Sequence, residues 1–434
     1  MDRPMRLGIA GLGTVGASLA RLIATNKDAY TLRAGRTIEL AAVSARDRAK
    51  DRGIDLTDVA WFDDPVDLAS NGEIDVFVEL VGGADGAAFD SVKAALHRGL
   101  PVVTANKALL AHHGVQLAKI AQRKGTSIFF EAAAAGGIPI IKTMREALRG
   151  NRVSRVYGIL NGTCNYMLTR MEKEGIAFED CLRDAQRLGY AEADPTFDIG
   201  GFDAAHKLAL LTSLAFGCEI DLDSIFIEGI EAVSTEDIEA AADLGYRIKL
   251  LAVAQRTESG IEQRVHPTMI PAHSALAQVD GVTNAVAVDT DLLGSILLVG
   301  PGAGGNATAS AVLSDVIDVA QGIRLPTFAV DPALLAPYKK ARMRAHEGGY
   351  YIRLSVLDRV GAFASIARRM AENSISLESI VQRKREGERD AETAPVILIT
   401  HETTEAAVRK ALDAVSRDGH LKGEPRMVRI EALD

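Results

Sequence analysis

Residues 7–16 read LGIAGLGTVG, an apolar strand pattern followed by a Gly-x-Gly-x-x-Gly turn. In this spacing Gly11 makes a tight turn, Gly13 lets a diphosphate approach the backbone, and Gly16 permits close packing of the following helix on the strand. The free N–H groups at the start of that helix favour an anion. The stretch therefore predicts a dinucleotide-binding turn, with a merely tight strand–helix turn as the alternative.

Strands and helices alternate along the first 135 residues. Strand patterns occupy residues 7–10, 38–43, 74–80, 101–104 and 127–130, and helical patterns occupy residues 15–25, 89–98 and 108–124. This alternation predicts a doubly wound parallel sheet with helices on both faces, a Rossmann domain of the α/β class. We expect it to span residues 1–135, with a returning helix at about residues 306–325 that packs on the same sheet.

The residues after the second strand bear on the choice between NAD and NADP. Ser44 and Arg46 come first there, followed by Asp47. A guanidinium near the ribose suits the 2′-phosphate of NADP, whereas an NAD-selective site places a carboxylate on the ribose hydroxyls. The sequence favours NADP with Arg46 as a contact, while Asp47 keeps NAD open. The alternative for Arg46 and Arg48 is a solvated surface loop.

Asn106 and Lys107 follow directly after the fourth strand. Ligands of open α/β sheets bind at the carboxyl ends of the strands, so we expect Lys107 to face substrate, nicotinamide or a carboxylate. The alternative is that these residues only begin the next helix, with Asn106 as its cap.

The largest group of candidate active-site side chains lies between residues 188 and 207. A turn-rich loop carries Glu192 and two aspartates, and Asp203 and Lys207 lie four residues apart on the helix that follows. The rest of that helix is apolar all round, and a lysine and an aspartate on so buried a helix are costly unless paired. We predict an active-site role for Glu192, Asp203 and Lys207, with a helix cap as the alternative for Asp203. His206 faces another side and is predicted to be structural.

The remaining chain divides into three parts. Residues 136–305 mix long helical patterns with several strands, including a hairpin around residues 293–295, which predicts an α+β unit with its own sheet. Residues 326–349 contain Pro326, Pro332, Pro337 and two glycines, as in a linker. Residues 350–434 follow the order βαββαβ, which is typical of a small ferredoxin-like domain.

Composition excludes several classes of protein. The chain of 434 residues has 49 basic and 58 acidic residues, so a nucleic-acid or anionic-membrane surface is not expected. Its three cysteines cannot form a disulfide framework, and the scattered histidines give little support for zinc. Because the first strand begins at residue 5, with no apolar leader and no membrane-spanning segment, we expect a soluble cytoplasmic protein.

Three stretches together resemble homoserine dehydrogenases: Asn161-Gly162-Thr163-Cys164-Asn165-Tyr166, the loop of residues 189–195, and residues 203–207. The glycine turn, the Asn106-Lys107 step and the glycine-rich loop at residues 300–305 occur in the family's order, so the resemblance covers about residues 5–325. It implies NAD(P)-dependent interconversion of L-homoserine and L-aspartate 4-semialdehyde, in threonine, methionine and isoleucine biosynthesis.

The resemblance also implies roles for single residues. Lys207 would donate the proton to the carbonyl oxygen, Lys107 would contact cofactor and substrate at the same site, and Glu192 and Asp203 would hold the amino acid. The positions that match dinucleotide contacts are Leu12, Thr14, Val15, Gly189 and Gly304. A monovalent cation, usually sodium in this family, would lie on main-chain carbonyls of Glu131, Ala134, Gly136 and Ile138.

Residues 350–430 resemble an ACT domain, an amino-acid-sensing module. Residues 358–363 match its strand–turn–helix signature, except that Val360 stands where proline is usual. The resemblance implies a regulatory domain, with threonine as a hypothetical effector, and the apolar middle unit suggests a homodimer or homotetramer.

Two other functions stay open at this point. A different Rossmann oxidoreductase, acting on a sugar or another amino-acid semialdehyde, would share the glycine turn but need not share residues 158–210. A non-catalytic regulator that binds a dinucleotide and an amino acid would have no need of two lysines and an acid pair in one cleft.

Overall fold

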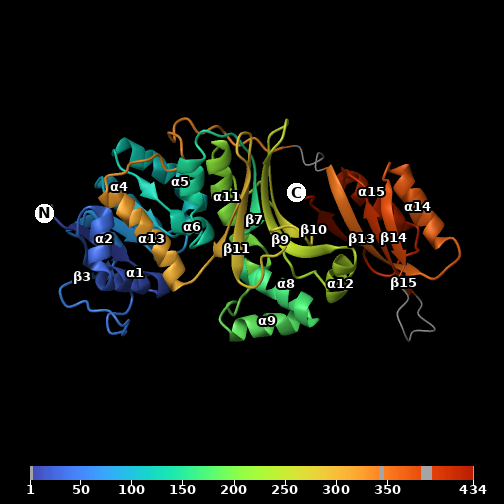
Figure 1. Cartoon of the computed structure of the whole chain (residues 1–434), viewed down its shortest axis with the longest axis horizontal. Helices are drawn as coiled ribbons and strands as arrows, with labels where there is room; N and C mark the ends of the chain where they lie inside the picture. The colour runs from blue at the N-terminus through green and yellow to red at the C-terminus, as the bar shows by residue number, and fades with distance from the viewer. Residues whose placement is uncertain (1–2, 342–346, 383–392, 434) are drawn as a thin grey trace.

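The computed structural model describes residues 3–341, 347–382 and 393–433. Figure 1 shows three units in a row, with the N-terminal unit (blue) at one end and the C-terminal unit (red) at the other. Residues 342–346 of the predicted linker, Met1, Asp2, Arg383 and Asp434 lie outside the described residues.

The N-terminal unit is built on a six-stranded parallel sheet with the order β3-β2-β1-β4-β5-β6. Its strands are β1 (Met5–Ala10), β2 (Ile38–Ser44), β3 (Ala60–Phe62), β4 (Val76–Glu79), β5 (Val102–Thr104) and β6 (Ile128–Phe129). The predicted Rossmann sheet is confirmed, although its edge strand β3 was not predicted. The strand order reverses between β1 and β4, which is where such sheets bind ligands.

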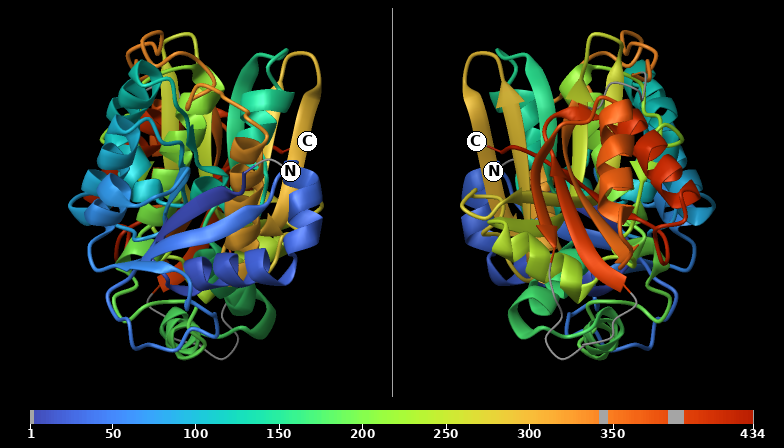
Figure 2. Two further views of the ribbon diagram at one scale, coloured as in Figure 1. Left: turned by 90° about the vertical axis from the view of Figure 1, so that its left-hand side faces the viewer. Right: turned by 90° about the vertical axis from the view of Figure 1, so that its right-hand side faces the viewer.

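Helices cover both faces of this sheet. They are α1 (Thr14–Thr25), α2 (Lys27–Ala34), α3 (Pro65–Asn71), α4 (Ala87–His97), α5 (Lys107–Arg123) and α13 (Gly305–Ala320). Helix α13 comes from far along the chain and packs against α1, and its Val312 and Val316 are buried in one core with Leu7 and Ile9 of β1. The left view of Figure 2 looks onto this unit.

The second sheet runs through both remaining units, with the order β12-β11-β7-β9-β10-β17-β13-β15-β14. Its central strands are β7 (Val153–Ile159), β9 (Tyr246–Arg256), β10 (Ile261–Pro271), β11 (Thr283–Thr290) and β12 (Gly294–Pro301). The predicted hairpin is present as β11 and β12. The sequence did not predict that β10 pairs in parallel with β17 (Arg426–Ile430), so that the central and C-terminal sheets are one.

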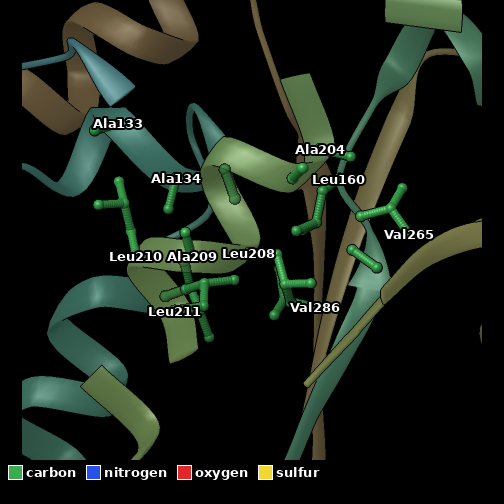
Figure 3. Close-up of a cluster of buried hydrophobic side chains, with 14 of the residues drawn as sticks. Ala133, Ala134, Leu160, Ala204, Leu208, Ala209, Leu210, Leu211, Val265 and Val286 are labelled. Atoms are coloured by element: carbon green, nitrogen blue, oxygen red, sulfur yellow. The ribbon is translucent and has the colours of Figure 1, made fainter. Parts of the chain in front are cut away.

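Helices and short segments flank the central strands. They are α6 (Glu131–Ala135), α7 (Ile140–Lys142), a π-helix (Thr143–Ala147), α8 (Gly162–Glu174), α9 (Phe178–Arg187), α10 (Thr196–Ile199), α11 (Phe202–Phe216), β8 (Phe226–Ile227) and α12 (Thr235–Asp243). Helix α11 is buried almost all round, as its sequence predicts. Figure 3 shows its leucines between Ala134 on one side and Val265 and Val286 of the sheet on the other.

The C-terminal unit has the predicted βαββαβ order. It consists of β13 (Glu347–Leu357), α14 (Ala362–Glu372), β14 (Leu377–Gln382), β15 (Thr393–Thr400), the short β16 (Thr403–Thr404), α15 (Glu405–Arg417) and β17. Its strands are antiparallel to their neighbours within the unit, and α14 and α15 pack against each other over one face. The ferredoxin-like fold is therefore confirmed.

The described part of the predicted linker is packed rather than free. Phe328 is fully buried against Phe130, and its ring fills the space that a side chain at Gly114 would need. Two bridges, between Cys218 and Ala336 and between Ile261 and Lys340, tie the same segment to the central unit. None of the helices in the described residues is long and apolar enough to cross a membrane.

Candidate active site

The glycine turn lines a pocket of about 700 Å³ at the carboxyl end of β1. Gly11 has a φ of +97°, and a Cβ there would lie 2.4 Å from the carbonyl oxygen of Leu80. A Cβ at Gly16 would lie 2.0 Å from the Gly11 oxygen, so this glycine does allow close packing. Helix α1 begins at Thr14 with no side-chain cap, which leaves its first N–H groups for an anion.

Basic side chains line this pocket together with the glycine turn. Arg46, Lys50 and Arg52 line it together with Ser44 and Asp47. The Asp47 carboxylate accepts hydrogen bonds from the backbone N–H groups of residues 49 and 50, at 2.9 and 3.2 Å, and is used within its own loop.

Sequence reasoning missed Arg52. Its Nε donates to the Leu12 oxygen (3.2 Å) and its Nη2 to the Asp47 oxygen (2.6 Å), so it ties the glycine turn to the loop after β2. No motif marks this residue, because it lies eight residues beyond the end of β2 and is brought back only by the loop.

A second pocket of about 770 Å³ holds the predicted charged cluster. The Asp203 carboxylate lies 3.1 Å from Nζ of Lys107 and 2.7 Å from Nζ of Lys207. Lys207 also donates to the Leu160 oxygen at 2.7 Å, and Asn161 Nδ2 donates to Asp203 at 2.9 Å. Three parts of the chain that are distant in sequence therefore meet at one carboxylate.

The elements explain this convergence. Lys107 is the first residue of α5, directly after β5, and the side chain of Asn106 caps that helix by accepting from the Leu109 N–H. Helix α11 begins after Gly201, whose φ is +85°, so Asp203 lies inside the first turn. The alternative that Asp203 is the helix cap is therefore wrong, and its carboxylate is free to pair with the lysines.

Burial and charge act in opposite directions on the acids of this pocket. Burial of Asp203 favours its neutral form, but the ammonium groups of Lys207 and Lys107 hold its pKa well below the usual range. Burial raises the pKa of Asp198, and the Asn161 side chain, which donates to it at 2.9 Å, partly opposes this. Asp203 is thus ionised at neutral pH as the common partner of two cations.

The other predicted residues divide between the two pockets and the surface. Gly189, Gly304 and Lys107 line the second pocket, and Gly11, Leu12 and Gly13 line the first, whereas Thr14, Val15 and Gly16 line neither. Glu192 is exposed and lies outside the lining of both pockets. A substrate role for Glu192 stays a prediction, and it requires the loop of residues 189–195 to turn inward.

His206 makes ring contacts rather than joining the charged cluster. Its ring meets His112 at 5.5 Å and Phe197 at 5.3 Å between centroids, edge to face in both cases. Burial lowers its pKa, which favours the neutral imidazole. These contacts agree with a structural residue.

The segment predicted to hold a cation lies against the second pocket. The Glu131 carboxylate accepts from the backbone N–H groups of Ile141 and Lys142 at 2.8 Å each, and burial together with Asp315 raises its pKa to about 7. The described residues contain no cluster of three or more acidic, histidine or cysteine side chains that could hold a metal. Main-chain oxygens at the buried end of α6, where Gly136 has a φ of +59°, are the ligands that fit a hard monovalent cation.

Family models match three parts of the chain. They are "Homoserine dehydrogenase, NAD binding domain" at residues 11–131, "Homoserine dehydrogenase" at residues 139–317 and "ACT domain" at residues 350–417. The homoserine dehydrogenases of Neisseria gonorrhoeae and Pseudomonas aeruginosa are 41% and 43% identical, over 99% and 100% of both chains. The chain belongs to the homoserine dehydrogenase family. It is therefore an oxidoreductase with a nicotinamide-cofactor domain and a C-terminal ACT domain.

Solved structures agree with this assignment. A homoserine dehydrogenase from Thiobacillus denitrificans superposes with a TM-score of 0.93 at 42% identity, covering 100% of this chain and 99% of that one. A hyperthermophilic archaeal homoserine dehydrogenase, in complex with NADPH, matches 74% of this chain and 99% of its own at a TM-score of 0.64 and 28% identity. Neither a different Rossmann oxidoreductase nor a non-catalytic regulator is favoured by these findings.

Two glycines of the turn give a matched test of how it works. Gly11→Ala places a Cβ against backbone at a positive φ, and we expect it to destabilise the domain by about 1–3 kcal/mol. A Cβ at Gly13 meets nothing within 4 Å, so Gly13→Ala should keep the melting temperature but weaken cofactor binding at least about tenfold by obstructing the diphosphate. Thermal melts and fluorescence titration of NADPH measure both effects. Unchanged cofactor affinity in Gly13→Ala would contradict this use of the turn.

Proposed function

We propose that Lys207 is the group that exchanges a proton with the substrate oxygen, while the cofactor exchanges a hydride with the adjacent carbon. The supporting observation is that Lys107 and Lys207 meet at Asp203 in a pocket that Gly300–Gly304 also line. In the oxidation of L-homoserine, Lys207 in its amine form would accept the proton of the terminal hydroxyl, and a bound nicotinamide would accept the hydride of the adjacent C–H bond. In the reverse direction the ammonium returns the proton to the aldehyde oxygen.

The remaining residues orient the amino acid. Lys107 lies on the cofactor side, at the end of β5, and its ammonium can hold the substrate oxygen or carboxylate. Asp203 is engaged by both lysines and keeps Lys207 in place. Asp198 lines the same pocket and is the carboxylate available for the substrate ammonium, with Glu192 joining if its loop closes.

Lys207 can be tested with two substitutions. Lys207→Ala removes the proton donor, and we expect turnover to fall at least about 10²–10⁴-fold with NADPH binding nearly unchanged. Lys207→Arg keeps a charge for Asp203 but cannot release a proton at ordinary pH, so it should be equally inactive while folding normally. An absorbance assay of nicotinamide reduction with homoserine measures turnover. Near-normal activity in the arginine variant would exclude Lys207 as the proton relay.

We also propose that the enzyme prefers NADP to NAD. Arg46, Lys50 and Arg52 line the first pocket, and the carboxylate of Asp47 accepts hydrogen bonds within its own loop. The archaeal relative bound to NADPH is consistent with this preference.

Arg46 and Arg48 offer a matched comparison for this preference. Arg46 lines the pocket, whereas Arg48 lies over the Trp61 ring outside the lining. We expect Arg46→Ala to weaken NADP binding about tenfold or more with little effect on NAD, because it loses charge-assisted hydrogen bonds to the 2′-phosphate. Arg48→Ala should change neither. Equal losses for the two cofactors in a binding titration would refute the role of Arg46.

We propose that threonine acts at the ACT domain, although Val360 replaces the usual proline and is fully exposed. Titration of threonine against activity should show inhibition that Asp358→Ala, in the signature turn, relieves. The exposed Asp413→Ala on α15 is the control. The whole chain is used, because removal of residues 350–434 would expose the edge of β10. Absence of inhibition, or the same response in all three proteins, would reject the hypothesis.

Three further properties are proposals. The first is a sodium ion on the carbonyls of Glu131, Ala134, Gly136 and Ile138. It would stabilise the Gly300–Gly304 loop, because Gly137 N–H donates to the Pro301 oxygen at 3.0 Å. Unchanged activity in sodium-free buffer would contradict this proposal.

The second is a homodimer or homotetramer. It is favoured by the exposed side chains of Leu292, Leu293 and Val299 on the β11–β12 hairpin. Sedimentation of the protein as a monomer would refute it.

The third is a cytoplasmic location. It is favoured by the three buried free cysteines, which suit a reducing compartment, and cell fractionation can check it.

A further inference from the structure

Asn284 is a buried polar side chain that has no hydrogen-bond partner among the described residues. It is the second residue of β11, opposite Gly300 of β12, and only 1% of its surface is exposed. Neither Oδ1 nor Nδ2 makes a hydrogen bond to any part of the chain that the structure describes. Buried amides are nearly always paired, because an unpaired one forfeits its hydrogen bonds to water. Asn284 lines the second pocket, so the missing partner is a ligand of that pocket.

The surrounding chain makes room for this side chain. A Cβ at Gly302 would fall 2.0 Å from Cγ of Asn284, and a Cβ at Gly162 would fall 3.4 Å from its Oδ1. The backbone of Gly302 does not have a positive φ, so glycine is needed there for the close approach alone. Both glycines line the same pocket.

A buried network fixes the backbone just before Asn284. The Nδ2 of Asn165, on α8, donates to the carbonyl oxygens of residues 279, 281 and 283 at 3.0–3.1 Å. Lys249 holds Asn165 in turn, with its Nζ 3.2 Å from Oδ1 of Asn165. The Asn284 amide therefore enters the pocket from a segment that is already ordered, as a preorganised contact requires.

The position of the loop beside Asn284 points to the cofactor. A Cβ at Gly305, where α13 begins, would lie 2.8 Å from Oγ of Ser18 and 3.0 Å from Cγ2 of Thr14, so the end of this loop touches the helix that follows the glycine turn. The same pocket contains Lys107 and Lys207. Asn284 thus shares one pocket with both lysines and with a loop whose end contacts α1, and a nicotinamide ring that reaches from the glycine turn to the lysines would pass through this pocket.

We propose that the side-chain amide of Asn284 pairs with the carboxamide of the nicotinamide ring and sets which face of the ring meets the substrate. A carboxamide offers an NH₂ donor group and an oxygen acceptor, which match Oδ1 and Nδ2 of Asn284. A substrate carboxylate offers acceptors only and would leave Oδ1 unpaired. This inference rests on the hydride transfer proposed above.

The test compares oxidised NADP with its 3-acetylpyridine analogue, in which a methyl group replaces the amide NH₂. The wild-type protein should bind NADP at least about fivefold more tightly, because the analogue cannot donate to Oδ1. In Asn284→Ala this ratio should fall to about one. The exposed Asn306→Ala, next to the same loop, should keep the wild-type ratio.

Asn284→Asp is the second variant, and it keeps the test available should Asn284→Ala not fold. It preserves the acceptor for the amide NH₂ but loses the donor, so both cofactors should bind more weakly while their ratio stays above one. Melting temperatures report folding of each variant.

An Asn284→Ala protein that folds and keeps the wild-type ratio would overturn the proposal. A rise in the KM for homoserine alone, with the ratio unchanged, would likewise overturn it by assigning Asn284 to the amino acid. The titration contains no amino acid, so failure of the proposed hydride transfer, seen as absent homoserine oxidation by the wild-type protein, is distinguished from failure of this pairing.

Discussion

One buried carboxylate, shared by two ammonium groups, holds the candidate catalytic crevice together. Asp203 would be costly to bury alone, and Lys207 would be costly on a helix that is otherwise apolar. The opposite charges offset each other's cost of burial, and Asn161 donates a further hydrogen bond to the same carboxylate. Because Lys107 starts α5 of the Rossmann unit while Asp203 belongs to α11, this pairing also fixes the two units relative to each other at the crevice.

The crevice lies where an edge of the parallel sheet faces an edge of the mixed sheet. The parallel sheet presents the carboxyl ends of β1, β4 and β5, where the glycine turn and Lys107 lie. The mixed sheet presents the end of β7, which leads to Asn161, and the end of β12, which leads through Gly304 into α13. Helix α13 then returns from that loop to the first sheet, so residues of both units lie beside the crevice.

Sequence patterns predicted correctly those features that depend on residues close together along the chain. The glycine spacing, the strand–helix alternation, the apolar α11 and the Asp203–Lys207 spacing each depend on neighbours along the chain, and each is present in the structure. Glu192 shows the limit of such reasoning, because nothing in a turn-rich loop states which of its carboxylates turns inward. Arg52 and Asn284 show another limit of prediction from sequence. Their neighbours in space are distant along the chain and are brought together only by a loop, for Arg52, and by strand pairing, for Asn284.

The joining of the central and C-terminal sheets had no local signal either, since parallel pairing of β10 with β17 links residues 268 and 429. It places the ACT domain in direct contact with the segment that supports the active site. Arg429 of β17 reaches Glu228, whose N–H donates to the Val265 oxygen of β10, and Ile230 N–H donates to the Ile199 oxygen beside Asp198. These contacts connect β17 with the residues beside Asp198. This contiguity gives the effector proposed for the ACT domain a short physical route to the second pocket.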